Sequence, residues 1–206
     1  MNPLPLSAKH LALLLLLSLA LRLQAADQMV SLRPTSKLTI QGTSNLHTWK
    51  VATQEIDVVD CTGIFSTDKT LKPGRSQRNI RGSIPVNSLH SSTDDWADNL
   101  IYNQLKGKTN PRILFHFSEL TPTASLDPHN GECIFDSRCE LVVAGVTNEI
   151  CVSLTLIAVG PNRAKITGTT SLNMSSFGVH PGFQSDALKV DDEVKIGFEW
   201  LLAAND

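Results

Sequence analysis

The sequence lacks any cluster of basic residues. Its 206 residues contain 18 Lys and Arg against 20 Asp and Glu, which gives a formal net charge of −2 at pH 7. Binding of DNA or RNA depends on grouped Lys and Arg side chains that contact phosphates. The composition therefore predicts that nucleic acid is not a partner of this protein.

Motifs that define common catalytic or metal sites are also missing. The chain has no G-x-S-x-G, no H-E-x-x-H, no C-x-x-C and no pair of carboxylates in a recognisable setting. The histidines beyond the first 30 residues are scattered without the spacing of metal ligands: His47, His90, His116, His129 and His180. We expect no catalytic residue, no metal site, no cofactor and no redox catalysis by cysteine.

Long hydrophobic runs are absent except near the start of the chain. Residues 11–21 are almost all apolar, follow Lys9 and His10, and precede the small residues Ala25 and Ala26. The run is too short for a comfortable transmembrane helix, and its flanks are typical of a cleavable export signal. No later stretch is long enough to span a bilayer.

We therefore predict a signal peptide over residues 1–25 and a single mature domain over residues 26–206. Cleavage removes Lys9 and Arg22, leaving 16 basic against 20 acidic side chains and a formal charge of −4. The expected product is an exported protein, periplasmic or secreted, with no integral membrane segment.

Four cysteines remain in the mature part: Cys61, Cys133, Cys139 and Cys151. An even number in an exported chain permits two disulfide bonds, and we expect disulfide bonding here. The three possible pairings stay open. If Cys133 and Cys139 share one regular strand, they lie roughly 20 Å apart and do not pair with each other.

Strict alternation of apolar and polar residues recurs along the whole mature chain. Positions of one parity are apolar or Gly at 38/40, 80/82/84/86, 113/115/117, 135/141/143, 152/154/156, 166/168/172 and 194/196/198/200. Period two at so many places predicts antiparallel strands with one buried face. Turn-forming clusters separate them at 72–77, 127–131 and 159–162. Counting 51–59, the pattern predicts about eight strands, which suits a barrel or a sandwich.

One segment, 92–108, departs from this alternation. Its apolar residues fall at helical spacing: Trp96, Leu100, Ile101 and Leu105. Ser92 and Asp95 have the spacing of a capping box, and Pro111 follows the expected end. We predict one short amphipathic helix that covers a sheet face or a barrel mouth. The longest irregular stretch, 173–192, is predicted to form a loop at a functional rim.

The order of these pieces over residues 36–202 resembles that of the YceI-like family of exported lipid-binding proteins. Two stretches carry the resemblance. In Leu105–Phe115 a helix ends and a Pro precedes an alternating strand, and ELVVAGVTNEI at 140–150 is similar to a family hairpin. The resemblance implies an all-β fold, an antiparallel lipocalin-like barrel of about eight strands, with one short amphipathic helix.

The same resemblance implies a function. It predicts an exported protein that sequesters or carries a long-chain lipid, such as a polyisoprenoid or an isoprenoid quinone, as a monomer or homodimer. The predicted ligand-binding residues are Leu38, Ile40, His47, Leu100, Leu105, Phe115, Phe117 and Phe177. The resemblance implies for His47, in GTSNLHTWK, a contact with the ligand headgroup at the barrel mouth.

Several alternatives stay open at this stage. The interior of an eight-stranded barrel is either filled by side chains or hollow. His47 either contacts a headgroup or hydrogen-bonds a neighbouring backbone group. The barrel is alternatively the scaffold of a cell-envelope interaction protein that uses the loop at 173–192, or an enzyme acting on a bound lipid with His47 as acid or base.

Overall fold

The computed structural model describes residues 30–32, 35–62, 79–92, 95–123, 132–160, 163–180 and 189–204. The signal peptide expected at 1–25 and the turn clusters at 72–77 and 127–131 lie outside these residues. The described strands are β1 (Val30–Leu32), β2 (Lys37–Ser44), β3 (Thr48–Thr53), β4 (Asp57–Thr62), β5 (Asn79–Pro85), β6 (His90–Ser91), β7 (Arg112–Pro122), β8 (Glu132–Val143), β9 (Val146–Gly160), β10 (Arg163–Asn173) and β11 (Val190–Ala204). One α-helix, α2 (Asp95–Gln104), and two 3₁₀ turns, η1 (Val86–Ser88) and η2 (Met174–Phe177), complete the described elements.

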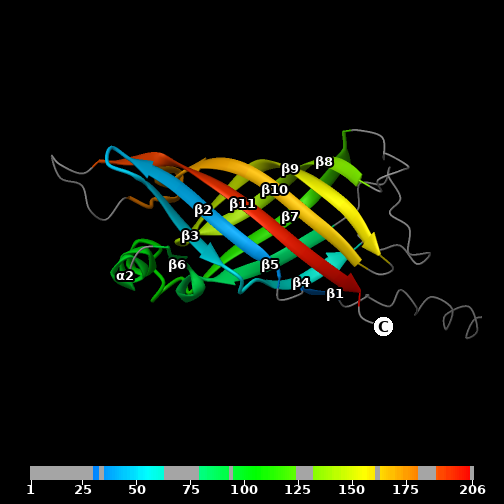
Figure 1. The fold of residues 1–206 in the computed structure, drawn as a ribbon, viewed down its shortest axis with the longest axis horizontal. Helices are drawn as coiled ribbons and strands as arrows, with labels where there is room; N and C mark the ends of the chain where they lie inside the picture. The colour runs from blue at the N-terminus through cyan, green and yellow to red at the C-terminus, as the bar shows by residue number, and fades with distance from the viewer. Residues whose placement is uncertain are drawn as a thin grey trace, which may run out of the picture.

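The strands form one antiparallel sheet that curls into a lipocalin-like barrel (Figure 1). Ten strands follow each other in the hydrogen-bonded order β4-β5-β7-β8-β9-β10-β11-β2-β3-β6, and β1 pairs with the end of β11. The all-β class and, within the described residues, the single helix are thus confirmed, but the predicted count of about eight strands is wrong. The sequence showed no alternation in β1 and β6, which are three and two residues long. It also counted 51–59 as one strand, whereas residues 54–56 separate β3 from β4.

This break between β3 and β4 brings the two edges of the sheet together. β3 pairs with β2 and β4 pairs with β5, so the chain passes from one side of the sheet to the other within residues 54–56. A chain of buried hydroxyls fixes the bend. Ser88 donates a 2.8 Å hydrogen bond to the carbonyl of Pro85, so the Thr53 hydroxyl donates to Ser88 Oγ, also at 2.8 Å. The amide of Glu55 in turn donates to Thr53 Oγ1 at 3.0 Å.

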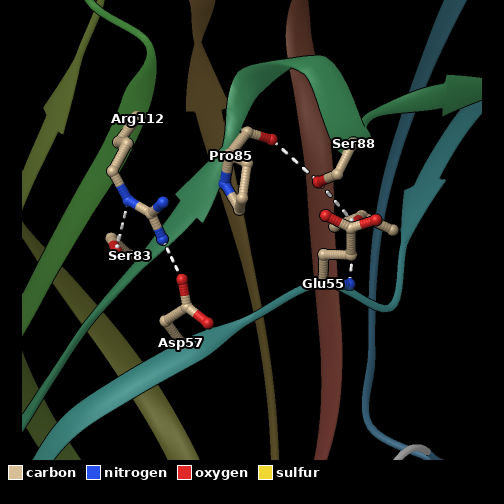
Figure 2. Close-up of polar contacts among 7 residues, drawn as sticks. Glu55, Asp57, Ser83, Pro85, Ser88 and Arg112 are labelled. Atoms are coloured by element: carbon tan, nitrogen blue, oxygen red, sulfur yellow. Dashed lines mark hydrogen bonds and ion pairs between the residues drawn. The ribbon is translucent and has the colours of Figure 1, made fainter.

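Arg112 holds the same corner from the outside (Figure 2). Its Nε donates to Ser83 Oγ at 2.8 Å, and its Nη2 pairs with the carboxylate of Asp57. The guanidinium therefore joins β7, β5 and β4 just beyond the bend. Because Asp57 and Arg112 are well exposed, solvent screens their ion pair, and the buried hydroxyl chain is the stronger restraint on the bend.

Burial along the strands follows the predicted alternation. In β8, residues 133, 135, 137, 139 and 141 are buried while the residues between them are exposed. The inward side chains form one core with an aromatic group at its centre, in which Trp200 stacks on Phe198 at 4.3 Å and on Phe115 at 5.0 Å between ring centroids. A period of two on a curled sheet places one parity inside the barrel, which is why alternation was informative.

Helix α2 lies at one end of the barrel, the end at which β2 turns into β3 (Figure 1). Asp98 attaches the helix to β6, since its carboxylate accepts the amide of Ser91 at 2.5 Å and lies 2.8 Å from Nδ1 of His90. These two contacts, the backbone amide first, lower the pKa of Asp98 below its ordinary value. The tight turn from β8 to β9 faces this end too, because Gly145 lies against Asn110, which follows the helix. No described helix is both long and apolar enough to cross a bilayer.

Candidate functional site

A cavity of about 590 Å³ occupies the interior of the barrel. Its wall comes from inward side chains of the strands, among them Leu38 and Val51 on neighbouring strands and Val152 across the sheet. Helix α2 and the η2 turn complete the wall at one end. None of the described residues that line it is Lys, Arg, Asp or Glu. The interior is therefore an apolar space of the size that binds small or elongated organic ligands.

All eight residues predicted as ligand contacts line this cavity. Leu38, Ile40, Phe115 and Phe117 extend from strands, Leu100 from α2, Leu105 from the turn just after α2, Phe177 from η2, and His47 from the turn after β2. The structure thus brings together residues that are up to 139 positions apart in sequence, from Leu38 to Phe177. Their role as ligand contacts stays a prediction.

The polar lining residues belong to the end of the barrel that carries α2. They are Ser44, His47, Ser91, Gln104, Thr170, Asn173 and His180. His47, Asn173 and His180 are exposed to solvent, so the cavity reaches the surface here, between the β2–β3 turn, α2 and the segment after β10. The cavity accordingly has an apolar body and a polar mouth.

Glycines make room for three of the aromatic rings on the inner wall of the barrel. Gly42 lies directly across from Trp49, Gly82 from Phe115, and Gly168 from Phe198 in neighbouring strands. In each pair the ring covers the glycine so closely that an added Cβ would stand 2.0 to 2.4 Å from it. Each ring thus occupies the space that a side chain at the glycine position would fill, an arrangement that only glycine permits, and Phe115 and Phe198 still reach Trp200 inside the barrel at 5.0 and 4.3 Å between ring centroids.

We expect Gly42→Ala to destabilise the protein by about 1–3 kcal/mol, because the new methyl would stand 2.0 Å from Cζ2 of Trp49 and push the indole away from the wall. Gly197→Ala is the matched control. A Cβ there meets only the Thr169 methyl at 3.9 Å, so the change should stay within about 1 kcal/mol. Urea unfolding followed by circular dichroism measures both. Equal midpoints for the two variants would mean that Trp49 is not fixed against Gly42.

His47 has little of the environment that proton chemistry needs. Its backbone amide donates to Ser44 Oγ at 3.1 Å, and its carbonyl accepts the Ser44 amide at 2.9 Å. These bonds close the turn, but the imidazole itself has no hydrogen-bond partner among the described residues. The side chain is exposed at the mouth, where it is available to a ligand. Within the described part of the chain, no group of His, Cys, Asp and Glu is arranged to hold a metal ion.

The expected disulfide bonds are not present. All four cysteines are described, and none is bonded to another. Cys133 and Cys139 both face inward from β8, while Cys151 is exposed on the outside of β9. Cys61 shares a register row with Cys139, but Ile80 and Phe117 stand between them. Three strand spacings amount to about 14 Å along the wall, too far for a disulfide bond.

The buried thiols act as small apolar side chains. Burial raises the pKa of both Cys61 and Cys139 to about 12, so both are neutral at physiological pH. A neutral thiol is a poor nucleophile and a poor metal ligand. Cys139 lines the cavity and contributes to its apolar wall.

Sequence reasoning missed most of the remaining lining residues. Ile113 shares strand β7 and a parity with Phe115 and Phe117, and the alternating apolar positions of β8 to β11 supply Leu141, Val152, Leu172, Val194, Ile196 and Trp200. Their alternation was visible in the sequence, and the signal that would have added them was this shared parity. His180 carried no such signal, since it lies in the irregular stretch after β10 and reaches the mouth only through the fold.

The fold and the cavity define a class: a curled antiparallel barrel with an apolar interior and helix α2 beside its mouth. The chain belongs to the YceI-like family, because the family model for the YceI-like domain matches residues 34–201. No curated protein matches the chain at a significant level.

Solved structures share this fold. BcnA of Burkholderia cenocepacia is similar with a TM-score of 0.67 at 20% identity, covering 84% of this chain and 100% of its own. A polyisoprenoid binding domain from Saccharophagus degradans, implicated in plant cell wall breakdown, is similar with a TM-score of 0.67 at 12% identity, covering 85% and 98%. The Campylobacter jejuni YCEI protein gives a TM-score of 0.54 at 14% identity, covering 80% and 85%. At these identities the likeness establishes the fold.

Proposed function

We propose that this protein binds a long-chain apolar lipid, such as a polyisoprenoid or an isoprenoid quinone, inside its barrel, and sequesters or carries it. The observation that carries the proposal is the cavity of about 590 Å³, whose described lining has no charged side chain. Moving apolar surface of a ligand out of water stabilises the complex by roughly 25 cal/mol per Å². A long hydrocarbon chain is therefore held by burial alone, without a polar anchor in the body of the cavity.

The division between an apolar body and a polar mouth supports a lipid with a polar head. The hydrocarbon chain would lie against Leu38, Phe115 and Phe117. Leu100 of α2 and Leu105, which follows α2, would cover it at one end. Ile40 and Phe177 complete the same wall. His47 would contact the headgroup at the mouth, because its exposed imidazole has no partner among the described residues. The S. degradans neighbour, described as a polyisoprenoid binding domain, supports the ligand class.

We propose further that the protein is exported, to the periplasm or outside the cell, as a mature domain over residues 26–206. The support is the predicted signal peptide at 1–25. An exported carrier of this kind would act as a monomer or homodimer. It would function as a binding protein without catalysis, since the imidazole of His47 has no hydrogen-bond partner among the described residues that would act with it in proton transfer.

The interaction-scaffold alternative depended on an exposed apolar patch in the stretch 173–192. In its described part, Phe177 and Val179 are only 4% and 7% exposed and pack inward. That part of the stretch completes the cavity instead of presenting an apolar patch, which favours the carrier. Phe183, also considered as a cap for the lipid, lies outside the described residues.

The test is organic extraction of the purified protein, expressed with its own signal, followed by mass spectrometry of the extract. The proposal expects a long-chain lipid in a ratio near one per protein. An extract without lipid, repeated after incubation with membrane lipids, would show that the cavity does not serve this purpose. Mass spectrometry of the intact protein from the same sample would show directly whether residues 1–25 are removed.

A further inference from the structure

Two large apolar side chains stand exposed at the mouth of the cavity. Leu46, at the tip of the β2–β3 turn, and Trp96, in the first turn of α2, are each 66% exposed. Trp96 also lines the cavity, and Leu46 precedes His47, which lines it as well. Figure 1 shows the turn and the helix at the same end of the barrel. The apolar lining is thus continuous with an exposed apolar rim.

Hydrogen bonds hold in place the turn and the helix that carry these two side chains. In the turn, Ser44 Oγ accepts the amides of Leu46 and His47, and Asn45 exchanges two hydrogen bonds of 2.8 and 2.9 Å with Lys189. Helix α2 is fixed to β6 through the carboxylate of Asp98. The exposure of Leu46 and Trp96 is therefore a property of well-restrained elements.

The rim fits a lipid bilayer better than a protein. Two side chains are far too little surface for a stable protein interface, which buries on the order of 800 Å² from each partner. A bilayer, in contrast, accepts a shallow insertion of a few apolar groups, and Trp is enriched where one end of a side chain is apolar and the other wet. Around the turn, the exposed residues Lys50 and Lys189 are accompanied by Asp191 and Asp192. This mixture of signs indicates that attraction to an anionic surface is not the main contribution.

We propose that Leu46 and Trp96 dock the barrel mouth onto a bilayer, so that the lipid passes between membrane and cavity without crossing water. This rests on the proposed function, since it concerns the entry route to the same cavity. For a lipid that leaves the bilayer through water, each exposed methylene lowers the equilibrium concentration in water about fourfold. Direct contact between mouth and membrane removes that barrier.

The test is flotation of the purified protein with phosphatidylcholine vesicles at low and high salt. Wild type floats with the vesicles at both salt concentrations. Leu46→Ser and Trp96→Ser each lower the bound fraction about tenfold. Leu114→Ser is the matched control, because Leu114 is an exposed leucine on the outer wall of β7, 46% exposed, that does not line the cavity. It floats like wild type.

A second measurement separates docking from lipid binding. Leu46 does not line the cavity, so Leu46→Ser should take up lipid from detergent solution to the same final level as wild type, but more slowly from vesicles. Wild type that carries lipid yet fails to float would overturn docking and leave the proposed function intact. Failure of both lipid uptake and flotation would remove the proposed function too. Equal losses in Leu114→Ser, or a dimer that Leu46→Ser abolishes, would also overturn docking, the latter by identifying the rim as a contact between copies.

Discussion

Trp200→Ala is expected to reduce the free energy of unfolding by about 3–5 kcal/mol, the usual cost of truncating a large buried aromatic residue. Trp200 is 2% exposed and stacks on Phe198 and Phe115, with Phe117 edge-on at 6.1 Å. Removing the indole deprives three rings of their common neighbour. Urea unfolding followed by circular dichroism measures the loss, on protein from which lipid has been extracted, because a bound ligand would add its own stabilisation.

Trp200→Phe is the informative companion variant. Nε1 of Trp200 is buried and has no hydrogen-bond partner among the described residues. An unsatisfied buried donor costs about 1–3 kcal/mol, so its removal offsets much of the lost ring volume. We expect Trp200→Phe to stay within about 1.5 kcal/mol of wild type. If it were as unstable as Trp200→Ala, the indole N–H would have a partner, and the picture of a purely apolar aromatic cluster would be wrong.

The wall of the barrel was predictable from sequence because a strand has a fixed period. Once Phe115 and Phe117 are assigned to the inside of the barrel, every second residue on the same strand must also face inward. Pairing with the neighbouring strands then extends the assignment to the residues opposite them. The helix was predictable for a similar reason, since Leu100, Ile101 and Leu105 repeat at a helical interval. Local periodicity therefore carries most of the information about which side chains face the cavity.

The closure of the barrel was not predictable in this way. The bend at 54–56 depends on Thr53 and Ser88, which are 35 positions apart and meet only in the folded chain. Because the bend is not visible in the sequence, the residues of β3 and β4 were counted as one strand, which made the predicted number of strands too small. The disulfide prediction failed for the same reason: the separations of Cys61, Cys139 and Cys151 depend on strand order and side-chain direction, not on spacing in the sequence.

Whether the barrel is hollow depends on these same long-range features. The diameter of a barrel grows with the number of strands, so an undercount of strands also underestimates the space inside. Gly82 and Gly168 were visible at inward positions in the alternation. Their meaning appeared only in the fold, where Phe115 and Phe198 occupy the space that side chains at these two positions would fill.

Filling this space should abolish lipid binding without harming the fold. Val152 on β9 and Val51 on β3 are each 3% exposed and line the cavity. We expect Val152→Phe combined with Val51→Phe to lower the lipid recovered by extraction at least tenfold. Each methylene of the lipid that an added ring displaces from the cavity lowers the binding free energy by about 0.8 kcal/mol. Two displaced methylenes therefore weaken binding by about tenfold. Val159→Phe, on the same strand but 45% exposed, is the control and should retain lipid.

Stability decides between a hollow and a packed interior independently of the ligand. In a packed core, two added rings would overpack and cost about 1–3 kcal/mol each. In a cavity of about 590 Å³ the rings find empty space, and their burial leaves the free energy of unfolding of the lipid-free protein unchanged or higher. Loss of lipid together with unchanged or increased stability is the result that the apolar cavity predicts. Loss of stability in the double variant, with Val159→Phe unaffected, would instead show that the interior is filled by side chains and that the lipid, if present, binds elsewhere on the protein.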